Sequence, residues 1–139
     1  MDKNNASLEK ELQQMYARAE HWISDYVFFE EEIRFLTNLL DKYFVGLIIS
    51  DSGKMDVLRW KARQLVELDD QRESIAKENK ETLVTIAKLL KNETPFDPQE
   101  FREEYSDLEN SHVGFLKRYQ KIKKEIFDLS TELQAPEKK

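Results

Sequence analysis

Residues that break helices or form cross-links are scarce in this chain, which has no cysteine, three glycines and three prolines among 139 residues. Without cysteine the chain forms neither disulfides nor thiolate metal sites, so nothing in it depends on an oxidising compartment. No stretch has the length of apolar residues that spanning a bilayer requires, and the polar N-terminus lacks the apolar run of a signal peptide. We therefore expect a cytoplasmic protein with no membrane association.

Basic residues do not gather in one place either. The net charge of −6 comes from 28 acidic and 22 basic residues, which are mixed along the whole sequence. Binding to a phosphate backbone needs a clustered basic face. The chain also lacks a glycine-rich phosphate loop, a serine nucleophile elbow and a zinc-ligand cluster. We therefore expect no nucleic-acid partner, no enzymatic activity and no cofactor.

The few helix breakers divide the chain into three helical segments. Gly53 ends the first segment, Pro95 and Pro98 end the second, and Pro136 ends the third. The predicted helices span residues of about 6–50, 55–91 and 98–134. A chain of 139 residues suits one domain. Residues 1–139 are therefore predicted to form a single all-α domain, an elongated antiparallel three-helix bundle with frayed termini.

Apolar residues recur at alternating steps of four and three in the first and third helices. In the first helix the positions are Leu8, Leu12, Met15, Ala19, Trp22, Tyr26, Phe29, Ile33, Leu36, Leu40, Tyr43 and Leu47. In the third they are Phe101, Tyr105, Leu108, His112, Phe115, Tyr119, Ile122, Ile126, Leu129 and Leu133. This heptad period of 3.5 residues is typical of left-handed, coiled-coil-like packing.

The third helix has a clear start. Asp97 is the predicted N-cap, Pro98 lies in the first turn, and Glu100 follows three residues after the cap. Phe96 is placed to pack on Phe101 as a hydrophobic staple.

The second helix has few apolar residues in its middle, where the predicted inward positions include Arg72 and Asn79. Short connections make neighbouring helices antiparallel, so heights in the bundle can be counted from the loops. The count places Asn79 level with Tyr26 on the first helix and with His112 on the third. We expect a buried polar layer in which His112 hydrogen-bonds Asn79 and Tyr26 and fixes the register of the helices.

The same histidine supports a rival hypothesis. Glu109 and His112 have the Glu-x-x-His spacing that places a carboxylate and an imidazole on one helix face, as in di-iron carboxylate bundles. Glu30 and Glu78 are the other carboxylates expected nearby, and Gly114 is expected to mark a close approach. Those bundles use two such pairs on four helices, whereas this chain offers one pair and three helices. A metal-binding bundle centred on Glu109 and His112 is the alternative function.

Arg72 and Asp69 fall on inward positions of the second helix as well. We expect Arg72 to lay its methylene chain along the core and keep its guanidinium in water. A buried arginine would instead need a carboxylate partner, and the candidates are Glu30, Glu31, Glu32 and Glu73.

The first helix carries more apolar surface than a three-helix bundle needs. Between residues 22 and 36 its apolar side chains cover most of its circumference, and the second helix has little to offer at that height. Something else should therefore cover Phe28, Phe35 and Leu39. Together with Trp22 these residues form the predicted interaction surface.

Three arrangements would cover this surface. The bundle could wrap the first helix centrally, with long Lys and Arg side chains completing the cover. The surface could form a groove for a helix of another protein. The first helix could instead pack against that of a second copy in a two-fold antiparallel pair. We favour the homodimer, which makes the protein a non-catalytic interaction or structural module.

Overall fold

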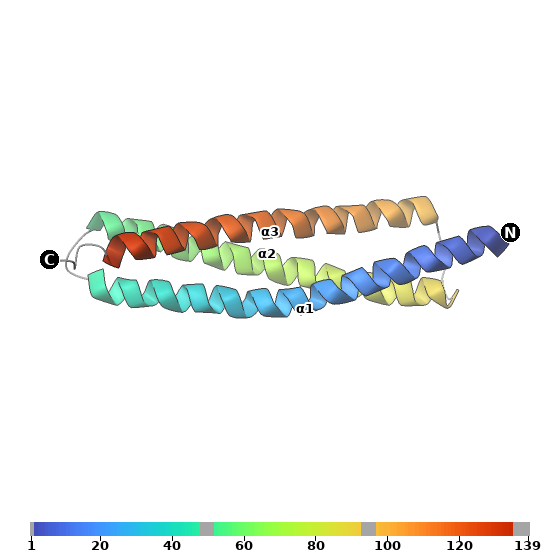
Figure 1. Cartoon of the computed structure of the whole chain (residues 1–139), viewed down its shortest axis with the longest axis horizontal. Helices are drawn as coiled ribbons and strands as arrows, with labels where there is room; N and C mark the ends of the chain where they lie inside the picture. The colour runs from blue at the N-terminus through green and yellow to red at the C-terminus, as the bar shows by residue number, and fades with distance from the viewer. Residues whose placement is uncertain (1, 48–51, 93–96, 135–139) are drawn as a thin grey trace. The chain divides into compact units, whose positions relative to one another are not determined.

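The computed structural model describes residues 2–47, 52–92 and 97–134, and side chains at 6–46, 53–92 and 97–132. The described residues form three α-helices and no strand: α1 (Asp2–Leu47), α2 (Ser52–Leu90) and α3 (Pro98–Gln134) (Figure 1). α1 packs against both α2 and α3, so the predicted all-α three-helix bundle is confirmed. The predicted helix bounds also agree within about four residues.

α3 begins as the sequence predicts. The Asp97 carboxylate accepts hydrogen bonds from the backbone N–H groups of Gln99 (3.0 Å) and Glu100 (3.3 Å). The Asp97 carbonyl accepts the first helical bond, from the N–H of Phe101 at 3.0 Å. The cap thus satisfies two backbone donors that have no acceptor within the helix.

α2 ends with a left-handed residue. Asn92 follows the helix with φ of 57°, and its N–H donates to the Leu89 carbonyl at 3.1 Å. Asparagine is, after glycine, the residue most often found in this conformation at a helix end, so the chain stops this helix without a glycine. Pro95, Phe96 and Pro136, which figure in the predicted helix ends and staple, lie outside the described residues.

Two glycines do not have the roles predicted for them. Gly53 lies in the first turn of α2 rather than between helices. Gly114 is exposed, and a Cβ atom added to it would meet nothing within 4 Å. The prediction that Gly114 marks a close approach is wrong.

The contacts divide the chain into two compact units, each of which contains part of every helix. Unit 1 comprises Met1–Phe28 and Glu73–His112, and unit 2 comprises Phe29–Arg72 and Val113–Lys139. That the chain forms a single domain stays a prediction.

In unit 1, α1 and α3 run in the same direction. Arg102 of α3 pairs with Glu11 of α1 (2.8 Å), and Glu109, further along α3, pairs with Arg18, further along α1 (2.5 Å). The buried residues of this unit are Leu12, Ala19, Trp22, Tyr26, Ile75, Asn79, Ile86, Leu89, Phe101, Tyr105, Leu108 and His112.

In unit 2, α2 and α3 run in opposite directions. Arg118 pairs with Glu67 of α2 (3.2 Å), while Glu125, further along α3, pairs with Lys61, earlier in α2 (2.6 Å). The buried residues of this unit are Phe29, Ile33, Leu36, Leu40, Leu58, Leu65, Leu68, Arg72, Phe115, Tyr119, Ile122 and Ile126.

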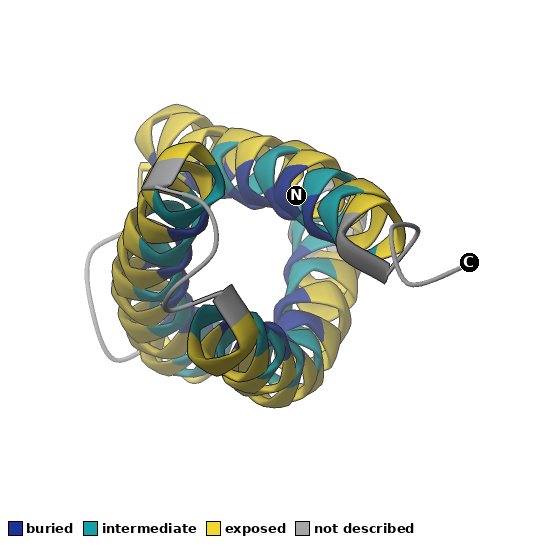
Figure 2. Cartoon of the chain, turned by 90° about the vertical axis from the view of Figure 1, so that its left-hand side faces the viewer, coloured by how far each residue is buried: buried dark blue, intermediate teal, exposed yellow. Residues whose placement is uncertain are grey.

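Burial follows the predicted heptad spacing. Every buried residue of α1 and α3 lies at a predicted position, and the buried side of each helix faces the other helices (Figure 2). Leu8, Met15, Tyr43 and Leu129 also lie at predicted positions but are half-buried. The apolar period of the sequence therefore selects the core face of these two helices.

Candidate functional site

A buried tyrosine–histidine pair lies in unit 1. The Tyr26 hydroxyl on α1 and Nδ1 of His112 on α3 are 2.5 Å apart. The His112 ring also stacks on Trp22, with ring centroids 4.8 Å apart, and Trp22 in turn stacks on Tyr105 at 5.8 Å. Tyr26 and His112 are thus placed together as the sequence predicts, within a cluster of aromatic rings.

The environment keeps both members of the pair neutral. Burial lowers the pKa of His112, although Asp25 and Glu109 raise it in part. Burial also raises the pKa of Tyr26, and the negative charges of Asp25 and Glu78 add to that effect. A neutral imidazole has one donor and one acceptor nitrogen, so a single hydrogen bond joins Nδ1 and the Tyr26 hydroxyl.

Asn79 contacts a different partner from the one predicted. Its Nδ2 donates to the backbone carbonyl of Ala19 at 2.8 Å, and no described residue donates to its buried Oδ1. Ala19 lies seven residues before Tyr26 on α1, about two helical turns. The prediction that Asn79 bonds within the layer of Tyr26 and His112 is therefore not met, since its amide bonds the backbone of α1 instead.

The carboxylates of the rival metal site are occupied or exposed. Glu109 pairs with Arg18 at 2.5 Å, Glu78 is exposed, and Glu30 belongs to unit 2, where arginines neighbour it. In the described part of the chain, no three His, Asp or Glu side chains are grouped as metal ligands. His112 turns its Nδ1 to Tyr26. The arrangement therefore gives the metal hypothesis no support.

Arg72 in unit 2 is buried, with only 7% of its surface exposed, so the prediction of a solvated guanidinium is wrong. Its Nε donates to the Asp69 carboxylate at 2.8 Å, and its Nη2 lies 3.9 Å from Glu30. The sequence predicts Glu30 as one partner of a buried arginine but does not predict Asp69. Asp69 stands three residues before Arg72 on α2, one turn away, which is a spacing that favours ion pairs.

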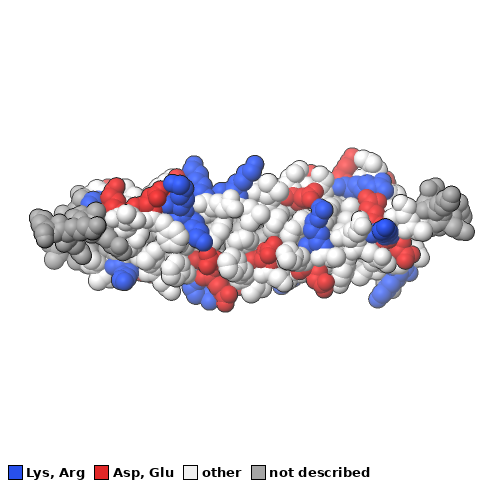
Figure 3. Space-filling model, in the orientation of Figure 1, with Lys and Arg blue, Asp and Glu red and all other residues white. Residues whose placement is uncertain are grey.

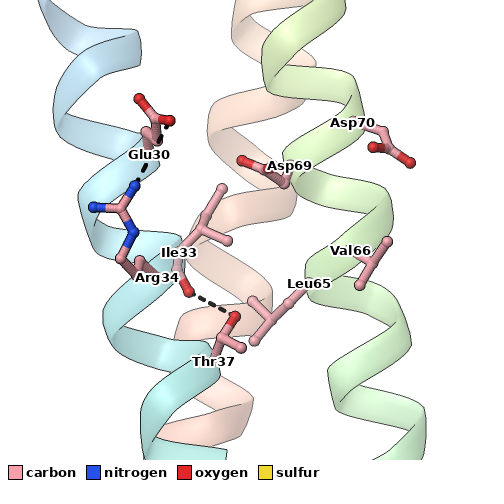
Figure 4. A pocket seen from close by; sticks show the side chains of 8 residues that line it. All are labelled: Glu30, Ile33, Arg34, Thr37, Leu65, Val66, Asp69 and Asp70. Atoms are coloured by element: carbon pink, nitrogen blue, oxygen red, sulfur yellow. Dashed lines mark hydrogen bonds and ion pairs between the residues drawn. The ribbon is translucent and has the colours of Figure 1, made fainter.

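An open cavity of about 250 Å³ lies beside this ion pair, between α1 and α2. Asp69 and Leu65 extend from α2 toward α1, and Asp70 points away from α1 (Figure 4). Across the cavity, Arg34 of α1 lies 3.8 Å from Glu30. The lining residues are Glu30, Ile33, Arg34, Thr37, Leu65, Val66, Asp69 and Asp70. The walls hold no pair of groups arranged for proton transfer or nucleophilic attack.

A second cavity, of about 360 Å³, lies between α1 and α3 in unit 1. Its charged lining consists of two ion pairs, Arg18 with Glu109 and Arg102 with Glu11, on either side of Tyr105. The charges therefore cancel within the cavity wall. Burial raises the pKa of Tyr105, so this phenol stays protonated and is not a candidate base.

A polar network that the sequence did not reveal joins α1 to α3 in unit 2. The Tyr119 hydroxyl and the Lys123 ammonium both donate to Oε1 of Glu32, at 2.5 and 3.1 Å. Hydrogen bonds from Tyr119 and Lys123 lower the pKa of Glu32, while burial and the bond to Glu32 raise the pKa of Tyr119 to about 12. Lys123 also lies 5.8 Å from the Phe127 ring centre. Tyr119 stands at a core position of the heptad pattern, where an apolar contact is expected. Its hydrogen bond to Glu32 depends on the position of α1, which the spacing within α3 does not give.

The predicted interaction surface is exposed only in part. Phe28 in unit 1 and Phe35 in unit 2 are 52% and 53% exposed. Leu39 is half-buried. Trp22 is only 6% exposed. Trp22 therefore does not belong to the surface, because it occupies a core position of the heptad pattern.

Charges on the surface are mixed, with Lys and Arg standing among Asp and Glu on the face shown in Figure 3. Within the described residues, no helix is both long and apolar enough to cross a membrane. Comparisons of the chain with protein families, curated proteins and solved structures find no match.

Proposed function

We propose that this protein is a non-catalytic, cytoplasmic helical module that self-associates through α1. The observation that carries the proposal is the exposure of Phe35, half of whose surface is in water although it stands on the most apolar helix of the bundle. Val45, further along α1 in the same unit, is 76% exposed. Exposed apolar side chains that form one contiguous patch mark protein–protein contact surfaces, and we infer such a patch on α1.

The energy available from such a contact is substantial. Burying a phenylalanine or valine side chain fully contributes about 1.5–3 kcal/mol. A two-fold pair buries each contact twice, once in each copy. Two copies of Phe35 and two of Val45 therefore offer several kcal/mol toward association, part of which offsets the lost freedom of two molecules.

The proposal is tested by the solution mass of the wild type and of a Phe28→Glu, Phe35→Glu double variant, measured by light scattering after size exclusion. We expect a wild-type dimer and a variant monomer that keeps its helical circular dichroism. Val84→Glu is the matched control, since Val84 is exposed to a similar extent (56%) but stands on α2. This control should stay dimeric. A wild type that is monomeric at high micromolar concentration contradicts self-association.

A further inference from the structure

A second heptad stripe runs along the outer side of α1 in unit 2. Glu31, Phe35, Asn38, Lys42 and Val45 follow one another at alternating steps of four and three, and all five are exposed. This is the same spacing as that of the buried stripe, so the five side chains share one face of the helix. α1 therefore carries two faces with a coiled-coil period, of which the described helices cover one.

The charged members of the outer stripe are Glu31 and Lys42. Neither Glu31 nor Lys42 forms an ion pair with any residue in the described part of the molecule, although several neighbouring acids and bases do. Along the stripe a negative Glu31 precedes Phe35 and Asn38, and a positive Lys42 follows them. A second copy turned end for end presents the complementary charges.

We propose that the outer stripe pairs with the same stripe of a second copy, antiparallel, about a two-fold axis midway between Phe35 and Asn38. This register rests on the proposed self-association through α1 and specifies it. Glu31 and Lys42 stand equally far from that midpoint, so each Glu31 faces Lys42 of the second copy. Phe35 faces Asn38 of the second copy. The two Phe35 rings lie about 4.5 Å apart along the axis, within contact of each other.

The other orientations are less favourable. A parallel pair in register places Glu31 against Glu31 and Lys42 against Lys42, so that like charges meet at both ends. An antiparallel pair shifted by one heptad in either direction moves Lys42 of the second copy about 10 Å along the axis from Glu31, so the opposite charges no longer face each other. The register centred between Phe35 and Asn38 places each Glu31 opposite a Lys42. It also brings the two Phe35 rings into contact.

Cysteine cross-linking tests the register directly, since the chain contains no cysteine of its own. In the Glu31→Cys, Lys42→Cys double variant, mild oxidation should give a covalent dimer on a non-reducing gel. Each single variant should give none, because two equivalent residues then lie about 16 Å apart along the axis, far beyond the span of a disulfide. Cross-linking of the single variants would indicate a parallel pair and overturn the proposal.

Charge reversal supplies an independent test by sedimentation equilibrium. Glu31→Lys or Lys42→Glu alone turns two attractions into two repulsions and should raise the dimer dissociation constant about tenfold. The double swap Glu31→Lys, Lys42→Glu restores opposite charges and should return the constant to within about threefold of the wild type. Glu104→Lys, an exposed acid on α3, changes the net charge equally and should have little effect.

The two proposals fail in different ways. A monomeric wild type overturns self-association and the register with it. A wild-type dimer whose double-cysteine variant does not cross-link, and whose charge swap does not restore affinity, keeps self-association and overturns the register.

Discussion

Asn79 allows the contribution of a buried polar side chain to be measured. It is fully buried, its Nδ2 donates to the Ala19 carbonyl, and no described residue donates to its Oδ1. Replacing Asn79 with leucine removes a hydrogen bond worth about 0.5–1.5 kcal/mol and an unpaired acceptor whose burial costs about 1–3 kcal/mol. Ala19 lies within α1, so its carbonyl keeps an intrahelical donor.

The apolar side chain adds a further term. The two methyl groups of leucine contribute roughly 1–2 kcal/mol by burial, against about 1 kcal/mol of strain where tetrahedral carbon replaces a planar amide. We therefore expect Asn79→Leu to raise the free energy of unfolding by about 1–2 kcal/mol and the melting temperature by a few degrees.

Urea unfolding followed by circular dichroism measures this difference. Asn79→Ala is the control, because it removes the same polar atoms but leaves a cavity, and should be at least about 2 kcal/mol less stable than the leucine variant. A loss of more than about 3 kcal/mol in Asn79→Leu would refute the reasoning, since it would mean that Oδ1 satisfies a buried donor that cannot survive alone.

Three further predictions follow from the same contacts. Gly114→Ala should raise the free energy of unfolding by about 0.5–1 kcal/mol, because an added Cβ atom meets nothing; no gain in urea midpoint would mean that Gly114 is needed by the fold. The lowered pKa of His112 means that the folded protein favours the neutral ring. The stability that the neutral His112 ring contributes is therefore complete above the unfolded pKa of about 6.5. It is lost as the pH falls below that value, because the unfolded state then binds the proton more readily. Urea midpoints between about pH 7.5 and pH 5.5 should show this slope in the wild type and a smaller one in His112→Gln, and equal slopes would contradict it. Arg72→Met should cost less than about 1 kcal/mol, since Asp69 is 40% exposed and water can solvate its carboxylate. Arg72→Ala should cost about 2 kcal/mol or more through lost packing, and equal losses in the two variants would show that the charge dominates.

The sequence was most informative where one physical effect dominates. Burial of apolar side chains has the period of the helix, so the core faces of α1 and α3 could be read from spacing alone. The cap at Asp97 is equally local, because the side chain bonds amides two and three residues ahead. Trp22 also follows the heptad rule. Its heptad position predicts burial, which the structure shows. The prediction that it belongs to an outer surface conflicts with that position.

Features that depend on a second helix were harder to predict. The level of Asn79 on α1 depends on where the chain turns between α1 and α2, which spacing within a helix does not reveal. The burial of Arg72 depends on two carboxylates, Asp69 and Glu30, whose combined position emerges only from the packed helices. The bond from Tyr119 to Glu32 is of the same kind. The spacing of residues predicts on which face of a helix a side chain lies. The residue that it contacts on another helix depends on how the helices pack.

Each of these polar residues of α2 and α3 has a partner on α1, although Arg72 also pairs with Asp69 within α2. In unit 1, Asn79 of α2 bonds Ala19 and His112 of α3 contacts Tyr26. In unit 2, Arg72 of α2 approaches Glu30, and α3 reaches Glu32. A slip of α2 or α3 by one heptad would keep apolar residues opposite one another, because the pattern repeats every seven residues.

The same slip would break each of these contacts with α1. It would leave Asn79 and His112 buried without their partners, at about 1–3 kcal/mol for each group. The polar contacts therefore select one alignment of α2 and α3 on α1 within each unit, at some cost in stability. This explains why removal of Asn79 is expected to raise stability rather than lower it. Contacts with α1 thus fix the alignment of α2 and α3. The outer stripe of α1 carries charges that, in our proposal, pair with those of a second copy.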